Sequence, residues 1–394
     1  MQRILTINGG SSSIKFAVFE EVGPERVLEG AIERIGFPDA SLWMKGQGSD
    51  VFRQIVVPDH GTAVAVLTDN IDCGALAAVG HRVVHGGQRY SKPHLITEKM
   101  IDDLQNLGPF DPEHLPEELM LIDAFHRKFP DQKQVACFDT AFHRDLPRVA
   151  TLLPIPRRFD EKGIRRYGFH GLSYEFLMQE LVRLGDTAAT SGRVILAHLG
   201  NGASLSAVYR GKPLDTSMSF TPASGLMMST RTGELDPGVA AYLMQSEKLT
   251  IEQFSHLVNH ESGLLGVSGT SSDMRDLLMR ETNDLRAFEA VELFCYQVKK
   301  YIGAYAAALG GLDVLVFSGG IGENSAVIRA RICEGLAFLG IEIDEKCNAE
   351  NEPVISGGRV VVRVVHTDEE LMIAKSVFSM LESKIDRDNE NDNT

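Results

Sequence analysis

The clearest feature of the hydropathy pattern is a pair of short apolar runs on either side of a small polar turn. Residues 3–7 and 14–19 are rich in Ile, Leu, Val and Phe, and Asn8-Gly9-Gly10-Ser11-Ser12-Ser13 lies between them. This pattern predicts two β-strands joined by a tight turn. Gly allows close approach to the backbone and Ser adds donors, so such a turn can hold a phosphate group. Taken alone, the pattern fits an ordinary hairpin loop equally well.

The same pattern occurs again near the middle of the chain. Apolar runs at 194–197 and 205–209 flank His198-Leu199-Gly200-Asn201-Gly202-Ala203-Ser204, and a third Gly-rich turn at 318–324 follows the apolar run 314–317. This repeat resembles the plan of the actin-like ATPase and sugar-kinase superfamily, in which two similar lobes offer phosphate-holding hairpins to a shared cleft. The chain has neither a Gly-x-x-x-x-Gly-Lys-Ser/Thr loop nor a full Gly-x-Gly-x-x-Gly fingerprint. The main evidence for a P-loop protein or a dinucleotide-binding protein is therefore missing.

We therefore expect an α/β fold of two similar actin-like, ribonuclease H-like lobes with a nucleotide cleft between them. The N-terminal lobe is expected to comprise 1–150 and 369–394, and the C-terminal lobe 151–368. Elsewhere the patterns predict short strands with Gly turns over 27–67, where 62–67 is the start of a helix, and strands near 77–84 and 134–138. Helices are predicted at 97–107, 116–128, 290–309, 326–338 and 369–383. Residues 237–309 look mostly helical with a break at 263–272, and the polar tail from 386 is expected to be disordered.

Four polar residues stand out against these elements. Arg82 lies within an apolar strand, where it is either a structural ion pair or an anion-binding group. Asp139 ends a strand, where it is either a functional carboxylate or the N-cap of the next turn. His170 stands between Phe and Gly after an Arg-rich stretch, and Arg231 lies in a long polar loop of a kind that usually carries function.

Composition narrows the function classes. At 394 residues, with 43% hydrophobic and 24% charged residues, the chain is long enough for two or three globular domains. Its net charge of −15 argues against nucleic acid or an anionic membrane as a partner. No apolar run is long enough for a membrane span, and the N-terminus shows no signal region, so we expect a cytoplasmic protein. The five scattered Cys fit reduced thiols and make a zinc site improbable.

Taken together, these segments resemble the acetate kinase family over nearly the whole length of the chain. The resemblance is specific because several separate motifs occur in the family's order. They are Asn8 to Lys15, His81 to Gly87, Phe138 to His143, Arg166 to Gly171, His198 to Ser204, Phe220 to Pro237 and Gly319 to Ser325.

The resemblance implies a reversible transfer of the γ-phosphoryl group of ATP to acetate, giving acetyl phosphate and ADP by direct in-line displacement. It further implies Mg2+, which Mn2+ could replace, and a homodimer. The N-terminal lobe would be the acyl-substrate side and the C-terminal lobe the nucleotide side.

The resemblance also implies roles for individual residues. Asp139, His170 and Arg231 correspond to catalytic positions, Arg82 to the acyl-substrate arginine, and Asn8 and Glu369 to magnesium positions. Val84, Phe169 and Pro222 correspond to the acyl pocket. The implied nucleotide contacts are Lys15, His198, Leu199, Gly200, Asn201, Gly202, Asp273, Met274, Arg275, Gly320, Ile321, Gly322, Glu323 and Asn324.

Several positions depart from the family pattern. The family commonly has Ala in place of Gly9 and often His in place of Tyr174. The largest change lies at 108–116, where the family's loop His corresponds either to Asp111 or to a displaced His114. Because that stretch helps to line the family's acyl pocket, the acyl-chain preference stays open. The alternatives are a propionate or butyrate kinase, a non-catalytic actin-like nucleotide-binding protein, and a sugar kinase, which would need a general-base Asp and a polar sugar pocket.

Overall fold

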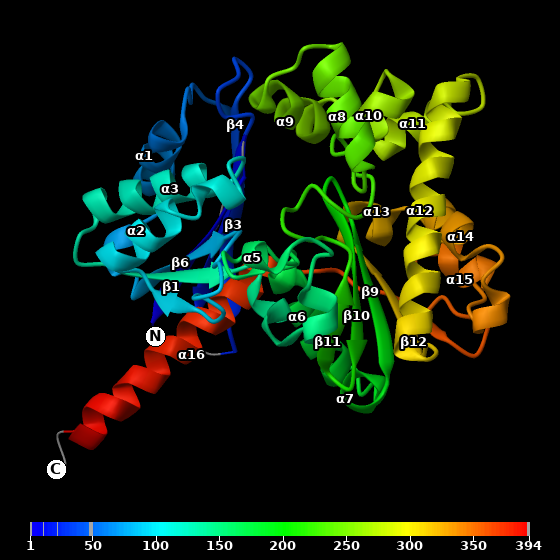
Figure 1. The fold of residues 1–394 in the computed structure, drawn as a ribbon. Coiled ribbons are helices and arrows are strands. Elements are labelled where there is room, and N and C mark those ends of the chain that lie inside the picture. The colour runs from blue at the N-terminus through cyan, green and yellow to red at the C-terminus, as the bar shows by residue number, and fades with distance from the viewer. Residues whose placement is uncertain (1, 11, 22, 47–49, 392–394) are drawn as a thin grey trace. The chain divides into compact units, whose positions relative to one another are not determined.

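The computed structural model describes residues 2–10, 12–21, 23–46 and 50–391, with side chains as far as Glu382. The chain divides into two compact units. Unit 1 comprises Met1–Phe142 and Asp368–Thr394, and unit 2 comprises His143–Thr367. Each unit contains one mixed β-sheet with helices packed on it (Figure 1).

Unit 1 has an eight-stranded sheet in the order β5-β4-β3-β2-β1-β6-β8-β7. Its strands are β1 (Arg3–Gly10), β2 (Ser13–Glu20), β3 (Glu25–Glu33), β4 (Ser41–Gly46), β5 (Val51–Gln54), β6 (Ala78–Val83), β7 (His94–Leu95) and β8 (Lys133–Phe138). Its helices are α1 (His60–Asn70), α2 (Glu98–Gln105), α3 (Leu115–Lys128) and α16 (Glu369–Asn391), with short 3-10 turns at Cys73–Ala75 and Gly108–Phe110. A further 3-10 turn, Ala141–Asp145, covers the boundary with unit 2.

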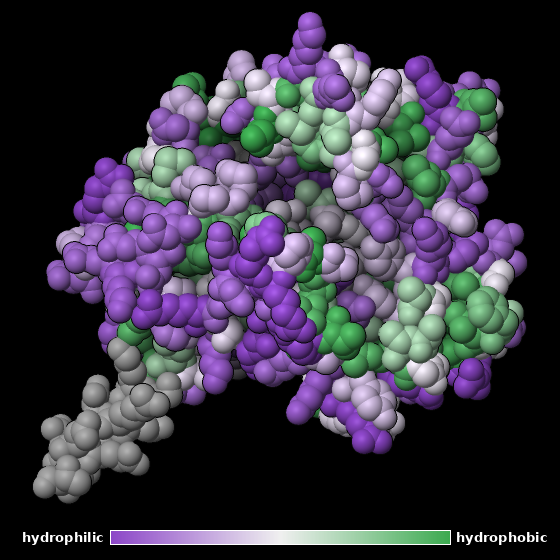
Figure 2. Space-filling model, viewed as in Figure 1, coloured by the Kyte–Doolittle hydropathy of each residue, from purple (hydrophilic) through white to green (hydrophobic). Residues whose placement is uncertain are grey.

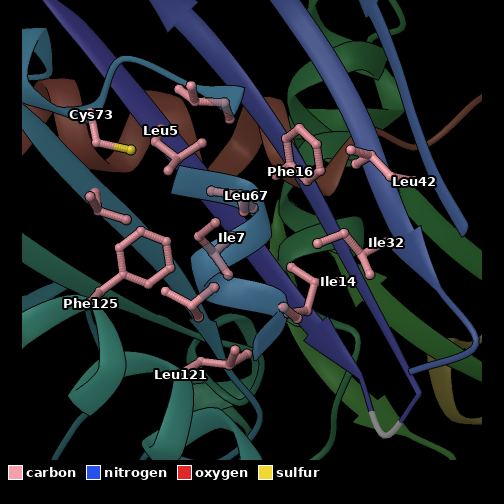
Figure 3. Packing of buried hydrophobic residues seen from close by; sticks show 14 of the residues in the cluster. Leu5, Ile7, Ile14, Phe16, Ile32, Leu42, Leu67, Cys73, Leu121 and Phe125 are labelled. Carbon is pink, nitrogen blue, oxygen red and sulfur yellow. The ribbon is translucent and has the colours of Figure 1, made fainter. Parts of the chain in front are cut away.

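The two faces of β1 serve different purposes. Leu5 and Ile7 point into a core that includes Leu121 and Phe125 of α3 and residues of α1, as Figure 3 shows. Gly9 lies on the same face, and a Cβ there would meet Leu121 Cδ1 at 2.4 Å. Alternate residues of a strand face opposite sides, so Asn8 lies on the other face, where α16 packs. Leu121 thus occupies the space that the side chain of an Ala at position 9 would need, which explains the Gly at this position.

Unit 2 has a five-stranded sheet in the order β11-β10-β9-β12-β13. Its strands are β9 (Arg193–Leu199), β10 (Ala203–Tyr209), β11 (Lys212–Thr216), β12 (Val314–Ser318) and β13 (Val361–Val364). Its first helices are α4 (Arg148–Thr151), α5 (Arg157–Asp160), α6 (Gly171–Arg183), α7 (Ala188–Ser191), α8 (Pro237–Ser246), α9 (Ile251–His260), α10 (Gly263–Ser268) and α11 (Met274–Arg280). They are followed by α12 (Leu285–Leu309), α13 (Gly319–Asn324), α14 (Ala326–Cys333), a 3-10 turn at Ala337–Leu339, and α15 (Glu345–Ala349).

The predicted repeat is confirmed as a repeat of topology. In unit 1 the strands β3, β2 and β1 are antiparallel neighbours, and β6 and β8 continue the sheet in parallel with β1. In unit 2 the strands β11, β10 and β9 are antiparallel neighbours, and β12 and β13 continue in parallel with β9. Each unit therefore places a hairpin next to two parallel strands, and the expected α/β fold of two similar halves is observed.

Several predicted boundaries were wrong. The helix expected at 290–309 begins at Leu285, and the helix expected at 326–338 ends at Cys333. The expected break at 263–272 contains the helix α10, because Gly263 and Gly269 adopt positive φ at its two ends and leave a short helix between them. The last helix continues past the predicted end at 383 as far as Asn391, although residues 386–391 were expected to be disordered. The remaining tail residues, 392–394, lie outside the described part, as does Ser11 of the first turn.

Buried hydrophobic side chains form the core of each unit. On the face seen in Figure 2, hydrophilic residues predominate and hydrophobic ones form scattered groups. Among the described residues, no helix has the length and apolar character that crossing a membrane requires.

Candidate active site

In unit 1, Arg82 is held between two buried carboxylates. Its Nη1 donates to Glu118 Oε1 at 3.0 Å and its Nη2 to Asp139 Oδ2 at 2.6 Å. The other Glu118 oxygen accepts the backbone N–H of Val84 at 2.8 Å. The Asp139 and Glu118 side chains are 0% and 3% exposed, whereas that of Arg82 is 14% exposed. A guanidinium carries five N–H donors, so this one is fixed in place and still has donors for a ligand.

The electrostatics of this cluster are dominated by burial. Loss of water raises the pKa of Glu118 to about 8, although Arg82 and the Val84 N–H act in the opposite direction. For Arg82, burial alone would lower the pKa, but the Asp139, Glu118 and Glu369 carboxylates raise it well above its usual range. Arg82 is therefore a permanent cation among acids.

A second acidic group lies on the α16 side of β1. Asn8 Nδ2 donates to Glu369 Oε2 at 3.0 Å and to Glu370 Oε1 at 3.3 Å. The pKa of Glu369 is raised, first by burial and then by the neighbouring Asp139 carboxylate. Lys15 pairs with Asn8 across the hairpin, and its side chain is exposed. The unit thus places three carboxylates near one arginine, and one of them, that of Glu369, accepts from the Asn8 amide.

One buried oxygen in this group has no protein partner. Asp139 Oδ1 accepts no hydrogen bond from the residues that the structure describes, although Oδ2 is bonded to Arg82. Within the same described ranges, no cluster of three or more His, Cys, Asp or Glu side chains has the arrangement of a metal site.

The altered loop at 108–116 is ordered by its own residues. Gly108–Phe110 forms a 3-10 turn, and the buried Asp111 accepts from both the backbone N–H and the Nδ1 of His114, at 3.2 and 3.0 Å. Phe110 meets the ring of His85 edge-on at 5.8 Å between centroids. Both candidates for the family's loop His therefore contact each other, directly before the helix α3 that carries Glu118.

In unit 2, two histidines stack at the turn of the second hairpin. The rings of His170 and His198 are 4.4 Å apart between centroids. His170 adopts a left-handed conformation (φ 59°) before α6, and its Nδ1 lies 2.9 Å from Ser204 Oγ. His198 Nδ1 lies 2.8 Å from Ser173 Oγ of α6. The buried hydroxyls of α6 and β10 thus fix both rings.

Arg231 reaches the same turn from the long polar loop. Its Nη1 donates to the Pro222 carbonyl at 3.2 Å. A Cβ placed on Gly202 would lie 3.1 Å from His170 Nε2 and 3.9 Å from Arg231 Nη1. Gly202 is therefore a point at which backbone, imidazole and guanidinium meet, as phosphate recognition requires. Phe169 and Pro222 are buried in this unit, whereas Val84 is buried in unit 1.

A pocket of about 510 Å³ opens beside this turn. Eight of the expected nucleotide contacts line it, together with three further residues. The eight are Gly200, Asn201, Asp273, Met274, Arg275, Gly320, Ile321 and Asn324, and the three are Ser229, Leu278 and Ser325. Its volume is in the range of small-molecule and cofactor sites.

Three expected nucleotide contacts have other roles in the structure. Leu199 is fully buried, and Gly322 packs against it, where a Cβ would be 3.6 Å from Leu199 Cβ. The Glu323 carboxylate accepts from the backbone N–H groups of Gly319 and Thr367, at 2.8 and 3.1 Å. Its other oxygen lies 2.7 Å from His366 Nδ1. These residues shape α13 and its surroundings and do not line the pocket.

Sequence reasoning missed two residues that support the site. Glu118 and Ser173 lie in ordinary helical patterns, and nothing local distinguishes them. For Glu118, the one available signal was a buried arginine that required a partner on a predicted helix.

The fold and these two groups define the class of protein. Each unit is an actin-like α/β half. Unit 1 holds an arginine between carboxylates, and unit 2 has a pocket beside a glycine-rich turn that is contacted by His170 and Arg231. The acetokinase family model matches residues 3–375. The chain belongs to the acetokinase family.

Individual relatives agree with this assignment. The acetate kinase of Rhodopseudomonas palustris (strain TIE-1) is 43% identical, and the alignment covers 96% of this chain and 98% of that protein. The propionate kinase of Citrobacter rodentium is 42% identical, with 95% and 96% covered. The crystal structure of Porphyromonas gingivalis acetate kinase is 39% identical, covers 97% of this chain and 100% of its own, and superimposes with a TM-score of 0.86.

Proposed function

We propose that this protein transfers the γ-phosphoryl group of ATP to acetate, reversibly, giving acetyl phosphate and ADP. The observation that carries the proposal is Arg82, a cation only 14% exposed that is fixed by Glu118 and Asp139 and has donors left for a ligand. A carboxylate acceptor needs such a cation, whereas a sugar hydroxyl would need a general base instead. Membership of the acetokinase family supports the same reaction.

The physical problem of this reaction is repulsion between anions. A carboxylate is already deprotonated at neutral pH, so no base has to activate it. Bringing it to a phosphate chain costs about 4 kcal/mol for each pair of like charges at ~4 Å and an effective dielectric near 20. Catalysis therefore depends on positive charge and alignment.

The proposed roles follow from the geometry. Arg82 binds the acyl carboxylate, and Asp139 orients Arg82 rather than removing a proton. His170 and Arg231, which converge near Gly202, stabilise the charge of the transferring phosphoryl group. The pocket beside Gly200 and Gly320 holds the nucleotide, and Lys15 is a further proposed nucleotide contact.

Magnesium fits the acidic residues of unit 1. Three carboxylates surround one arginine there, and Asp139 Oδ1 has no hydrogen-bond partner among the described residues. Asn8 and Glu369 would hold the ion, in the manner of sites that use one or two protein groups and complete the shell with phosphate and water. When bound, Mg2+ or Mn2+ supplies positive charge against the phosphates.

A propionate or butyrate kinase is the second candidate. The Rhodopseudomonas acetate kinase and the Citrobacter propionate kinase are almost equally similar to this chain, at 43% and 42% identity. Val84, Phe169 and Pro222 are proposed to form the acyl pocket, and the altered loop with Asp111 and His114 is next to α3. One methylene changes discrimination by only ~1–3 kcal/mol, so small differences here decide the preference.

An acyl-phosphate assay tests the proposal. The purified protein would be incubated with ATP, Mg2+, hydroxylamine and one of acetate, propionate, butyrate or glucose. We expect acyl hydroxamate with the short carboxylates, the highest kcat/KM with acetate, and no ADP release with glucose. A higher kcat/KM for propionate or butyrate would support the second candidate, and the absence of any acyl phosphate would indicate a non-catalytic nucleotide-binding protein.

We further propose that the protein works in the cytoplasm as a homodimer. Its five cysteines are free thiols, four of them buried, as expected for a reducing compartment.

Sedimentation equilibrium would test the proposed homodimer. A measured mass of one 43.2 kDa chain at micromolar concentration would contradict it.

A further inference from the structure

A buried arginine outside the groups described above lies behind the nucleotide pocket. Arg329, on α14, is 0% exposed. Its five hydrogen bonds match the five N–H donors of a guanidinium. Nε donates to Asn348 Oδ1 at 2.8 Å, Nη1 to the carbonyls of Gly322 and Glu323 at 2.9 and 3.0 Å, and Nη2 to the Asn348 carbonyl and Asn351 Oδ1 at 3.0 and 2.8 Å.

These acceptors are all neutral. A buried cation is costly unless it is fully hydrogen-bonded or paired, and no carboxylate in the described part of the chain forms an ion pair with Arg329. Burial lowers the pKa of Arg329, but arginine remains charged in proteins. Two of the acceptors are carbonyls of the last turn of α13, where a helix carries partial negative charge. Arg329 lies in the first turn of α14, and its side chain therefore caps the C-terminal end of the preceding helix α13.

The helix that it caps forms one side of the pocket. Gly320, Ile321 and Asn324 of α13 line the pocket, and so does Ser325, where the chain turns into α14. Asn348 completes this corner, because its Nδ2 donates to the Ala326 carbonyl at 2.9 Å. Arg329 and Asn348 thus connect α13 to α14 and α15 through hydrogen bonds.

We propose that Arg329 is a positioning residue for nucleotide binding: it fixes α13 so that its pocket-facing residues are preorganised for ATP. This inference rests on the proposed function in one respect, namely that the pocket binds ATP. Preorganisation of this kind affects substrate affinity without contact between the residue and the substrate.

The test compares Arg329→Lys with Arg331→Lys. Arg331 lies on the same helix, but its ion-pair partners are the carboxylates of Glu281 and Glu292 and not the carbonyls of α13. Lys keeps the charge and loses the planar fork. We expect Arg329→Lys to raise the KM for ATP about tenfold and to leave the KM for acetate within twofold, whereas Arg331→Lys changes neither. Equal changes in both KM values, or none, would overturn the inference.

A milder variant covers the case in which Arg329→Lys does not fold. Asn351 is exposed and has φ 58°, which Gly adopts without strain, so Asn351→Gly removes one acceptor and leaves the backbone unchanged. We expect a two- to threefold rise in the KM for ATP. An unchanged KM for ATP in this variant would count against the inference.

Hydrogen exchange separates this inference from the proposed function. In the nucleotide-free protein, the Arg329→Lys or Asn351→Gly change should increase amide exchange in 319–325 and leave β9 unchanged. If wild-type protein binds no ATP by calorimetry but exchange still rises, the proposed function fails and the anchoring of α13 stands. If wild-type protein binds ATP and neither exchange nor KM changes in the variants, the inference is wrong.

Discussion

At the scale of single residues, the chemistry depends on side chains held by partners that do not themselves react. Arg82 illustrates this, because Glu118 accepts from its Nη1 and Asp139 accepts from its Nη2. Glu118 also holds the Val84 backbone, so one buried acid orders two positions of the proposed acyl site. His170 and His198 are fixed in the same way by Ser204 and Ser173.

Arg82→Lys tests the proposed carboxylate contact. Lys keeps a cation for Glu118 and Asp139 but loses the fork that can bind a carboxylate through two N–H groups. We expect the KM for acetate to rise by about tenfold or more, since a charged hydrogen bond is worth ~1.5–3 kcal/mol. The KM for ATP should stay the same. Steady-state kinetics with each substrate varied in turn would measure both.

Arg89→Lys is the matched control. Arg89 lies on the same segment but is 58% exposed and pairs with Asp103. Its kinetic constants should equal those of the wild type. An unchanged KM for acetate in Arg82→Lys would show that Arg82 is only a structural ion pair.

At the scale of elements, the turn from β12 into α13 requires a residue without a side chain. Gly319 has φ +76°, and a Cβ there would lie 2.7 Å from the Leu199 carbonyl oxygen. Because β9 and β12 are parallel neighbours, neither strand can move away from this contact without breaking the sheet. The turn therefore presses α13 against the end of the second hairpin, where the pocket begins.

Gly319→Ala should destabilise the protein, whereas Gly320→Ala should not. A Cβ on Gly320 would meet no atom within 4 Å, and its φ is not positive, so Ala fits there. At Gly319, strain and overlap together should cost about 2–4 kcal/mol. Thermal unfolding followed by circular dichroism would show the difference. Equal melting temperatures for the two variants would mean that the turn relaxes easily.

At the scale of the whole molecule, the acidic character of the chain extends into its interior. The net charge is −15, and unit 1 contains Glu118, Asp139 and Glu369 near a single arginine. Buried acids are tolerated because Arg82 and backbone N–H groups offset part of the cost. The stability of the folded protein should therefore depend on pH through this group.

Glu118→Gln tests this dependence. The pKa of Glu118 is raised by burial to about 8 from 4.5, so the folded state binds its proton more tightly than the unfolded state does. Its contribution to stability is present below pH 4.5 and is lost as pH rises to about 8. The charged groups that face it are Arg82, Asp111 and Asp139. Wild-type stability should fall relative to Glu118→Gln across this window, by a few kcal/mol at ~1.4 kcal/mol per pKa unit.

The measurement is urea unfolding of both proteins between pH 5 and 8.5. Taking the difference between them removes the contributions of His81, His85 and His143, whose pKa values burial lowers to about 4. These histidines destabilise the protein as pH falls, which is the opposite sign. A constant difference across the window would contradict the raised pKa of Glu118.

The sequence by itself determined the two hairpins, the strands that follow them, the position of Arg82 within a strand and that of Asp139 at a strand's end. These features follow from local rules, namely apolar runs, Gly-rich turns and the end of a strand. It could also indicate that Arg82 needed an acid, because a charge in an apolar strand is costly.

Only the tertiary structure decided which side chains meet. Arg82 is hydrogen-bonded to Glu118, 36 residues away in the sequence, and to Asp139, 57 residues away. Ser173 is hydrogen-bonded to Thr367, which is 194 residues away. The structure also paired the Glu323 carboxylate with backbone N–H groups and Arg329 with carbonyls of α13. Such pairings depend on how strands and helices pack in three dimensions, and a local pattern of polar and apolar residues carries no information about that distance.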